Sequence, residues 1–516
     1  MKFILVTGGV ISGIGKGVSS SSLGHLLQCH GYNITMIKID PYLNIDAGTI
    51  SPFEHGEVFV LDDGTETDLD LGTYERMLNI RLSHNHSITT GRVYHNVLSA
   101  ERRGDYLGKT VQVVPHITDE IIYEIIEASE ILVEQKTPDI CIIELGGTVG
   151  DIESMPFIEA LRQLRFRVGK ENFCHIHMSL IPIVKEQKSK PTQHSFKELR
   201  SVGLSPDFIC CRCEEPVQDE IKDKISLFCM VPKERVISLH DVSSIYKVPS
   251  LLLDQNVPIL VLNRLKLFVN PSPITHSFIL QEYNDPVSIA IVGKYMKIKD
   301  SYLSLTNALI HSAHFIKRKL NIIWIDSENI NLEQLKQAQC IIIPGGFGNR
   351  GLDGKIFACK YARENKIPFL GICLGFQIAV IEYCRNVLGW ENANSQEFNN
   401  NPDSVIVNMQ DCKELGGTMR LGLKTIELSN RFADIYGDYT IKERYRHRYE
   451  INPKYAKDIA TNGLLWSGIS DGRISALELD NHPYYVAVQY HPEFLSRITS
   501  PPKLFIELMY HTIKNS

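Results

Sequence analysis

Residues 368–377 read Pro368-Phe369-Leu370-Gly371-Ile372-Cys373-Leu374-Gly375-Phe376-Gln377, and no other stretch of the chain is as informative. An apolar run that predicts a strand leads into Gly-x-Cys-x-Gly, and a segment that can be helical follows. This order is typical of a nucleophile elbow, in which a sharp strand-to-helix turn exposes the nucleophile. The flanking glycines allow the turn, and the helix N-terminus favours a thiolate. The alternative is a buried cysteine in an ordinary strand-to-helix turn.

Two other segments carry groups that would complete a hydrolytic site. The first, Ile343-Pro344-Gly345-Gly346-Phe347-Gly348, follows an apolar strand, and its backbone N–H groups could bind an oxyanion together with that of Leu374. The second, Val488-Gln489-Tyr490-His491-Pro492-Glu493-Phe494, places His491 and Glu493 on the same side of an extended stretch. Glu493 could then orient His491, which would act as base and acid. A His-Pro-Glu sequence alone is more often a loop, but the segments together predict a Cys-His-Glu site.

Short apolar runs alternate with helical patterns along the chain, which predicts an α/β fold with mainly parallel sheets. A polar stretch with Pro271, Pro273 and Pro286 separates two such series. We therefore expect two domains, at residues 1–267 and 287–516, joined by a linker at 268–286. Strands are expected at residues 3–6, 34–39, 140–144, 174–183 and 208–211, then at 288–292, 321–325, 340–343 and 368–371, and helices at 18–29, 117–133 and 156–168.

Composition and charge exclude several classes of protein. The chain has 516 residues and a net charge of −6, so nothing points to nucleic acid as a partner. No apolar run approaches the ~20 residues of a membrane span, and the first residues are interpreted as a buried strand rather than a signal peptide. The 12 cysteines therefore indicate reduced thiols and a cytoplasmic protein. The cluster Cys210-Cys211-Arg212-Cys213 is interpreted as a core strand rather than a zinc site, because no matching ligand pair lies nearby.

A glycine-rich loop follows the first expected strand. It reads Gly8-Gly9-Val10-Ile11-Ser12-Gly13-Ile14-Gly15-Lys16-Gly17, and its backbone N–H groups could cradle phosphates while Lys16 supplies a positive charge. The glycine spacing is one residue longer than in the usual P-loop, and Gly17 stands where a serine or threonine would bind Mg²⁺. The magnesium ligands must then come from elsewhere, and we expect Asp70 and Glu144.

Two polar segments stay open to more than one interpretation. Glu66 and Asp68 alternate with Asp70, but we interpret them as solvated. A second polyphosphate could bind at Lys188-Ser189-Lys190-Pro191-Thr192-Gln193, which offers two cations and two polar side chains. A surface loop would have a similar composition.

The second domain resembles the class I glutamine amidotransferases, which hydrolyse the side-chain amide of glutamine with a Cys-His-Glu triad. This resemblance implies that Cys373 is the nucleophile, His491 the general base and Glu493 its partner. The alternative to glutamine binding is that Arg444, Arg446 and Arg448 form a solvated basic stretch or a docking face between domains. The residues implied to hold glutamine are Gly346, Leu374, Gln377, Glu397, which suits the α-amino group, and Arg448, which suits the carboxylate.

The motifs as a set resemble the CTP synthases, and the likeness extends along essentially the whole chain. The matching stretches are residues 38–42, 48–52, 55–60, 68–72, 101–108 and 144–154. The family also shares the Gly15-Lys16-Gly17 sequence, in which this loop differs from the usual P-loop. The resemblance implies an N-terminal P-loop-type domain that binds ATP and UTP. ATP would phosphorylate O4 of UTP, and ammonia from glutamine would displace the phosphate, in the final step of de novo CTP synthesis. Ammonia would need an enclosed passage between the domains.

The resemblance also implies ligands and an assembly. Mg²⁺ would accompany ATP, GTP would be an allosteric activator, CTP would be a product inhibitor, and the chain would form a homotetramer, with filaments in some members. Which contacts belong to UTP and which to CTP stays open. The implied ATP contacts are Gly13, Ile14, Gly15, Lys16, Gly17, Val18, Lys38 and Asp70, with Asp70 and Glu144 as metal ligands. The implied UTP or CTP contacts are Ser12, Asp151, Ile152, Glu153, Lys188, Ser189, Lys190, Pro191, Thr192, Gln193 and Lys224.

Other classes of protein fit the sequence less well. An amidotransferase of the cobyric-acid-synthase kind has the same domain order but is not expected to carry the runs at residues 55–60 and 188–193. GMP synthase is disfavoured because no Ser-Gly-Gly-x-Asp-Ser loop is present. A scaffold protein with a dead site is contradicted by the intact triad residues and Lys16. The chain ends at Ser516, shortly after residues 491–493, so we expect no long regulatory tail.

Overall fold

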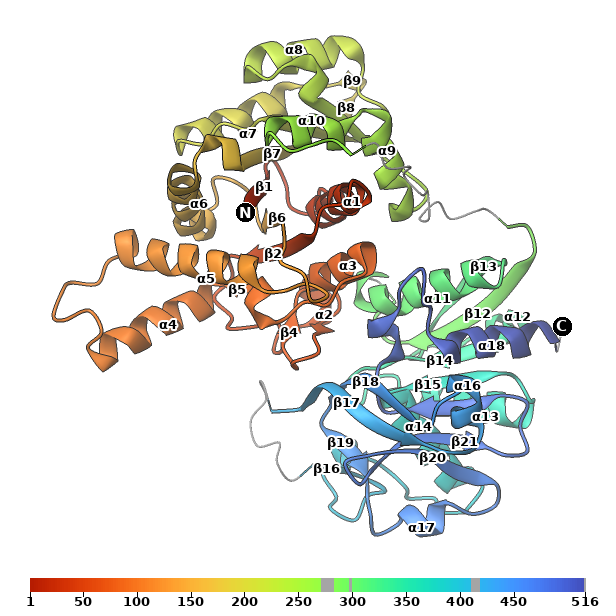
Figure 1. The fold of residues 1–516 in the computed structure, drawn as a ribbon. Helices are drawn as coiled ribbons and strands as arrows, with labels where there is room; N and C mark the ends of the chain where they lie inside the picture. The colour runs from red at the N-terminus through yellow and green to blue at the C-terminus, as the bar shows by residue number, and fades with distance from the viewer. Residues whose placement is uncertain (271–282, 297–298, 410–417, 515–516) are drawn as a thin grey trace. The chain divides into compact units, whose positions relative to one another are not determined.

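The computed structural model describes residues 1–270, 283–296, 299–409 and 418–514 (Figure 1). Contacts between Cα atoms divide the chain into two units. Unit 1 comprises Met1–Asp46 and Asp70–Leu280, and unit 2 comprises Ala47–Leu69 and Gln281–Ser516. Most of the linker predicted at residues 268–286 lies outside the described residues. The segment Ala47–Leu69 thus belongs by its contacts to the unit that holds the C-terminal half of the sequence.

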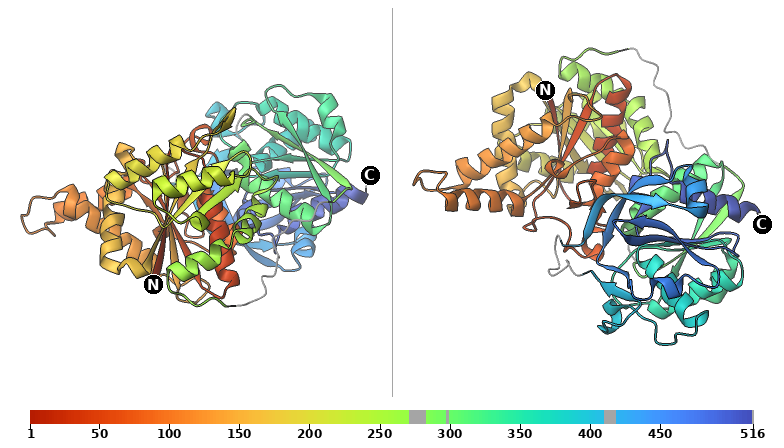
Figure 2. Two further views of the ribbon diagram at one scale, coloured as in Figure 1. Left: turned by 90° about the horizontal axis from the view of Figure 1, so that it is seen from above. Right: turned by 60° about the horizontal axis from the view of Figure 1, so that its bottom comes forward.

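Unit 1 is built on a seven-stranded sheet whose pairings are all parallel, in the order β11-β10-β7-β1-β6-β2-β5. Figures 1 and 2 show helices on both of its faces, as a parallel sheet buried on both sides requires. The strands are β1 (Lys2–Gly8), β2 (Ile34–Asp40), β5 (Ser87–Thr89), β6 (Ile140–Leu145), β7 (Phe173–Leu180), β10 (Phe208–Cys213) and β11 (Val236–His240).

The helices of unit 1 divide between the two faces of the sheet. Apolar side chains of four helices form a core with β1, β2 and β6: α4 (Thr90–Arg103), α5 (Thr118–Glu130), α6 (Met155–Val168) and α7 (Lys190–Ser201). Another group packs together: α1 (Lys16–Cys29), α9 (Val248–Asp254) and α10 (Val257–Arg264). The remaining long helices are α3 (Leu69–Leu78) and α8 (Asp219–Cys229).

The predicted elements of unit 1 are confirmed, with two wrong boundaries. The helix expected to reach residue 133 ends at Glu130, and Ile131 is already extended. The strand expected at residues 174–183 ends at Leu180, and Pro182 follows, which has no N–H to donate to a strand ladder. A short hairpin of β8 (Ile183–Val184) and β9 (Glu186–Gln187) takes the chain onward to α7. The cysteine cluster lies in buried strand β10, as expected.

Unit 2 contains a nine-stranded mixed sheet in the order β13-β12-β14-β15-β22-β21-β20-β17-β18. Pairings from β13 to β22 are parallel, and those from β22 to β18 are antiparallel. The parallel strands are β12 (Pro286–Gly293), β13 (Lys319–Asp326), β14 (Cys340–Ile343), β15 (Phe369–Ile372) and β22 (Tyr485–Val488). The others are β17 (Arg420–Leu428), β18 (Thr440–His447), β20 (Leu464–Ser470) and β21 (Arg473–Leu479). All four strands predicted for this half are confirmed.

Two apolar cores fill the two faces of this sheet. One contains side chains of α13 (Leu352–Glu364) and α14 (Leu374–Asn386). The other contains side chains of α11 (Leu303–Phe315) and α18 (Lys503–Lys514). Among the described residues, no helix is both long enough and apolar enough to span a bilayer.

The segment Ala47–Leu69 packs against β18 through two ion pairs. It forms α2 (Pro52–His55) and a small antiparallel ribbon of β3 (Phe59–Val60) and β4 (Glu66–Thr67). Arg444 Nε lies 2.6 Å from Asp62 Oδ1, and Arg446 Nε lies 2.7 Å from Glu66 Oε1. Glu66 is buried, so its interpretation as a solvated carboxylate was wrong. Arg444 is fully buried as well, so it is not part of a solvated basic stretch.

Candidate active site

Cys373 lies at the strained turn between β15 and α14. Its backbone has φ 54° and ψ −101°, in the left-handed half of the map that non-glycine residues avoid. Such strain costs about 1–3 kcal/mol and persists only where the surrounding structure enforces it. Here β15 is held between β14 and β22, and α14 begins at the next residue, Leu374. The turn therefore has the form of a nucleophile elbow.

The glycines of the motif are required because backbone segments pass very close to them. A Cβ atom on Gly375 would lie 2.1 Å from the carbonyl oxygen of Ile343, and one on Gly371 would lie 2.7 Å from the carbonyl oxygen of Gly375. Neither glycine has a positive φ. The sequence correctly marked both positions, but the reason is close packing of the strand, the helix and β14 rather than conformational freedom.

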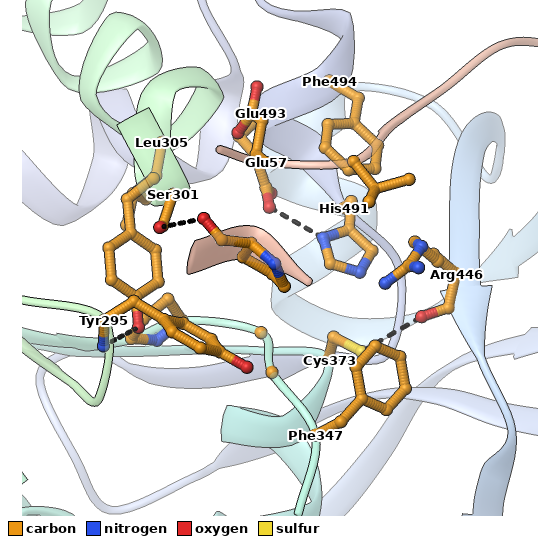
Figure 3. A pocket seen from close by; sticks show the side chains of 16 residues that line it. Glu57, Tyr295, Ser301, Leu305, Phe347, Cys373, Arg446, His491, Glu493 and Phe494 are labelled. Carbon is orange, nitrogen blue, oxygen red and sulfur yellow. Dashed lines mark hydrogen bonds and ion pairs between the residues drawn. The ribbon is translucent and has the colours of Figure 1, made fainter. Parts of the chain in front are cut away.

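His491 and Glu493 form a buried pair beside Cys373. His491 Nδ1 lies 2.7 Å from Glu493 Oε1, and the His491 ring stacks on Phe494. Figure 3 shows the imidazole between the Glu493 carboxylate and the Cys373 sulfur. Burial by itself disfavours the imidazolium, but the Glu493 carboxylate and the Cys373 sulfur outweigh it and raise the pKa of His491 to about 10. The site therefore favours a charged imidazole next to the sulfur.

A pocket in unit 2 opens onto these groups (Figure 3). The loop after β14 contributes Gly345 and Gly346, and a Cβ atom on Gly345 would lie 2.8 Å from His491 Cε1 and 3.4 Å from Cys373 Cβ. Segment Ala47–Leu69 also contributes to the wall. The lining includes Pro52, Glu57, Val58, Tyr295, Pro344, Gly345, Gly346, Phe347, Cys373, Arg446, His491 and Glu493.

Four of the residues implied to hold glutamine do not line this pocket: Leu374, Gln377, Glu397 and Arg448. Gln377 is buried, and its Nε2 donates to Tyr449 O and to Gln489 Oε1, each at 3.1 Å. The Glu397 carboxylate accepts a hydrogen bond from Gly348 N. Burial raises the pKa of Glu397, and neighbouring cations, including Lys294 and Arg448, lower it. Gly346 lines the pocket, and Leu374 follows the cysteine directly.

In unit 1 the glycine-rich loop precedes α1 as the sequence predicts. Gly13 and Gly15 have φ values of 70° and 85°, a conformation that favours glycine. Helix α1 begins at Lys16, and Lys16 Nζ donates to Gly147 O at 2.8 Å. Burial lowers the pKa of Lys16, while the neighbouring carboxylate of Glu144 raises it. A phosphate at this helix N-terminus would meet free N–H groups and a buried cation.

Asp70 and Glu144 lie together beside the first turn of α1. A Cβ atom on Gly17 would lie 2.2 Å from Asp70 Oδ1 and 3.4 Å from Glu144 Oε2. Lys38 forms an ion pair with Asp70, and its Nζ lies 3.6 Å from Glu144 Oε1. Burial raises the pKa of Glu144 to about 7, although Lys38 opposes the shift. Tyr74, which the sequence did not single out, donates to Glu144 Oε2.

A second pocket lies next to the glycine-rich loop within unit 1. Arg212, on β10, forms an ion pair with Asp241 at its rim. The lining is mostly apolar, with a few polar groups, and comes from several elements: Ile14, Gly15, Val18, Ser19, Arg212, Leu239, His240, Val242, Ile245, Val248 and Leu251. No local pattern singles out most of these residues, because they come together only when β10, β11 and α1 pack.

The residues implied to contact UTP or CTP occupy different surroundings in unit 1. Ser12 and residues 151–153 are exposed, and Asp151 Oδ2 accepts a hydrogen bond from Thr148 N at 2.9 Å. Thr192, in contrast, is buried and is hydrogen-bonded to Ser179. Lys188 pairs with Glu186, and Ser189 is buried. Lys190 and Gln193 line an open pocket, and Pro191 lies between them in the sequence. Lys224, on α8, is exposed.

Known proteins match both halves of the chain. Residues 2–267 match the family model CTP synthase N-terminus, and residues 297–509 match Glutamine amidotransferase class-I. CTP synthase of Dictyostelium discoideum is 51% identical over 99% of this chain and 98% of its own. CTP synthase 1 of Homo sapiens is 50% identical over 99% of this chain and 93% of its own. The solved glutaminase domain of Trypanosoma brucei CTPS with bound acivicin is 38% identical, over 44% of this chain and 94% of that chain, with a TM-score of 0.42.

The fold, the elbow and these matches define a glutamine-hydrolysing ligase that forms C–N bonds. The chain belongs to the CTP synthase family. It converts UTP to CTP in an ATP-dependent reaction, with glutamine as the source of nitrogen. This result also sets aside the cobyric-acid-synthase and GMP-synthase alternatives.

Proposed function

We propose that Cys373, His491 and Glu493 carry out the glutaminase reaction of this enzyme. The observation that carries this proposal is the buried His491–Glu493 hydrogen bond next to a cysteine held at a strained strand-to-helix turn. The Cys373 sulfur attacks the amide carbon of glutamine. The N–H groups of Gly346 and Leu374 stabilise the resulting oxyanion. His491 then gives its proton to the departing ammonia, while Glu493 keeps the ring oriented.

Glutamine would be held by groups around this pocket. Glu397 would receive the α-amino group and Arg448 the α-carboxylate, and Gln377 would help to shape the site. The interaction of Glu397 with nearby cations supports a site built for a zwitterion, since both signs of charge are present.

We also propose that ATP binds with its phosphates on the glycine-rich loop at residues 13–18. Lys16 and Lys38 would balance the phosphate charge, and the pocket lined by Val18 and Arg212 would take the adenine base. The apolar lining of that pocket supports a flat aromatic ligand. UTP, and CTP as product inhibitor, would be held by Ser12, residues 151–153, residues 188–193 and Lys224. Transfer of the γ-phosphoryl group to O4 of UTP would create the leaving group that ammonia displaces.

Asp70 and Glu144 fit a magnesium site. Both are carboxylates beside Gly17, which offers no side chain of its own, and Mg²⁺ prefers oxygen ligands. Among the described residues no group of three or more His, Cys, Asp or Glu side chains could hold a metal, so phosphates and water would supply the other ligands. Bound Mg²⁺ would neutralise charge on the transferred phosphoryl group.

We further propose a homotetramer that can assemble into filaments, with GTP as allosteric activator, in the cytoplasm. The tetramer is supported by large apolar side chains that unit 1 exposes, including Leu107 at 89% and Phe166 at 88% exposure. The cytoplasmic location is supported by the cysteine content of the chain. GTP activation rests on the family resemblance.

The triad and the phosphate site can be tested separately by measuring CTP formation with glutamine or with ammonium. Cys373→Ala should lose the glutamine-driven reaction by at least about a thousandfold and keep the ammonium-driven one, because only the first needs the thiol. Lys16→Ala should abolish both. A Cys373→Ala enzyme that still used glutamine would show that another residue is the nucleophile.

A further inference from the structure

Gln489 is a buried glutamine whose side-chain amide reaches the nucleophilic sulfur. It follows β22, two residues before His491, and is 1% exposed. Its backbone N–H donates to Ser475 O at 2.9 Å, which ties it to the strand alongside. Its Nε2 lies 3.7 Å from Cys373 Sγ, within hydrogen-bonding distance for sulfur. None of the motifs that define the triad assigns this residue a role.

The orientation of the Gln489 amide is set by a second glutamine. Gln377 Nε2 donates to Gln489 Oε1 at 3.1 Å and also donates to Tyr449 O at 3.1 Å. Because Tyr449 offers a carbonyl, Gln377 must present its NH₂ group there, and the same group faces Gln489. Gln489 therefore presents its oxygen to Gln377 and its NH₂ group to the sulfur. Both glutamines are buried, so an amide turned the other way would leave donors unpaired.

The sulfur also faces a group that opposes ionisation. The carbonyl oxygen of Arg446 lies 3.5 Å from Cys373 Sγ and accepts a hydrogen bond from the thiol. This contact stabilises the neutral form only, because a carbonyl oxygen repels a thiolate. An N–H donor aimed at the sulfur has the opposite effect and stabilises the anion. The Arg446 carbonyl thus favours the neutral thiol, and the Gln489 amide favours the thiolate.

We propose that Gln489 is a catalytic hydrogen-bond donor that stabilises the Cys373 thiolate and offsets the Arg446 carbonyl. The inference rests on the assignment of Cys373 as the nucleophile. The donor acts where the sulfur is anionic, before attack and again when the thioester is hydrolysed. In that second step water attacks the thioester carbon, its proton passes to His491, and the C–S bond breaks with the electron pair left on sulfur. Gln489 stabilises that leaving group.

The test is the pH dependence of alkylation of Cys373 by iodoacetamide, followed on the peptide that contains it by mass spectrometry. Only the thiolate reacts, so the midpoint of the rate profile reports its formation. Gln489→Leu removes the donor without adding charge, and we expect the midpoint to rise by about one pH unit, a tenfold loss of thiolate. Gln489→Glu keeps an acceptor for Gln377 but adds a negative charge, so its midpoint should rise further.

A control variant separates this effect from the loss of a hydrogen-bonded glutamine side chain elsewhere in unit 2. The control residue, Gln339, is half-buried. Gln339, just before β14, accepts a hydrogen bond from Ser288 N at 2.8 Å at the opposite edge of the parallel strands. Gln339→Leu should leave the Cys373 profile unchanged. If Gln489→Leu does not fold, Gln489→Met replaces it.

Two results would overturn the proposal. One is a Gln489→Leu or Gln489→Met midpoint equal to that of the wild type. The other is a shift in Gln489→Glu alone, which would show that added charge, rather than a lost donor, moved the profile. Neither result depends on whether the Cys373→Ala enzyme still uses glutamine. The assignment of Cys373 as the nucleophile is therefore tested by a separate experiment.

Discussion

Gly17 shows at the scale of one residue why the glycine-rich loop, which we propose binds phosphate, departs from the usual P-loop pattern. In most P-loops a hydroxyl at this position binds Mg²⁺ directly. Here the Asp70 carboxylate occupies the space that a side chain on residue 17 would need, since a Cβ atom there would lie 2.2 Å from Asp70 Oδ1. The glycine and the carboxylate are therefore complementary. Restoring the usual serine would remove the ligand that we propose in its place.

Gly17→Ser should thus disable the enzyme rather than improve it. We expect the ammonium-driven rate of CTP formation to fall at least about tenfold, because the new side chain displaces Asp70 from Glu144. The glutamine-driven rate should fall by the same factor. Steady-state assays at saturating ATP and UTP measure both.

Ser22→Ala on the same helix is the control. Ser22 is buried, and its hydroxyl has no hydrogen-bond partner among the residues that the structure describes, so its removal should leave both rates unchanged. A Gly17→Ser enzyme as active as this control would show that Asp70 does not need its present position.

Strand β18 shows at the scale of one element how two parts of the sequence support the same site. The carbonyl oxygen of Arg444 accepts a hydrogen bond from His491 N at 2.8 Å, and that of Arg446 contacts the Cys373 sulfur. The side chains of the same two arginines bind Asp62 and Glu66. One strand therefore links the proposed triad to a segment far away in sequence.

Asp62→Asn tests how far this link stabilises unit 2. Arg444 is fully buried, so the loss of its carboxylate partner should cost about 2 kcal/mol, less than a fully buried pair because Asp62 is 31% exposed. The thermal unfolding temperature of unit 2 should fall by about 5 °C. Calorimetry measures this change, and the glutamine-driven rate should fall relative to the ammonium-driven one.

Asp403→Asn provides the comparison at an exposed pair. Asp403 and Lys454 are 69% and 60% exposed, and such pairs contribute little to stability. We expect a change of less than about 1 °C. Equal effects of the two substitutions would contradict a structural role for the buried pair.

At the scale of the whole molecule, unit 1 exposes large apolar side chains that are relevant to the proposed assembly of several copies of the chain. Leu107 follows α4 and has a φ of 52°, so an exposed leucine is held there in a conformation that leucine avoids. Val114 is also exposed, close by in the sequence. Exposed apolar groups of this size are typical of surfaces that bind another protein. In this family member we expect that partner to be a second copy of the chain.

Leu107→Asp should therefore weaken the proposed tetramer without harming the fold. Aspartate tolerates the left-handed conformation better than leucine, so the local backbone should persist, while a charge at the interface opposes burial. Sedimentation velocity at micromolar concentration should show a shift from tetramers to smaller species.

Tyr439→Asp changes a comparably exposed side chain of unit 2, at 76% exposure, and should leave sedimentation unchanged. Identical sedimentation of both variants and the wild type would remove Leu107 from the interface.

The sequence by itself determined the α/β class, the predicted strands and the glycine-rich loop before α1, and it pointed to Cys373, His491 and Glu493 as the proposed triad. These features depend on local patterns: apolar runs of strand length, glycines at fixed spacing, and His and Glu two residues apart. It could not assign Glu66 or Arg444, because a charged side chain in a polar stretch reads as solvated until its partner is known.

Only the tertiary structure brought together groups that are far apart in the sequence. It placed the segment Ala47–Leu69 against β18, assembled the pocket around Arg212, and directed the Gln489 amide at the Cys373 sulfur. It also showed that glycine is needed at positions 371 and 375 because neighbouring backbone packs closely against them, and not because the turn needs conformational freedom there. Each of these features depends on contacts between residues far apart in the sequence. The energy of such a contact depends on how deeply the two groups are buried and on which group each one meets, and a local sequence pattern contains neither kind of information.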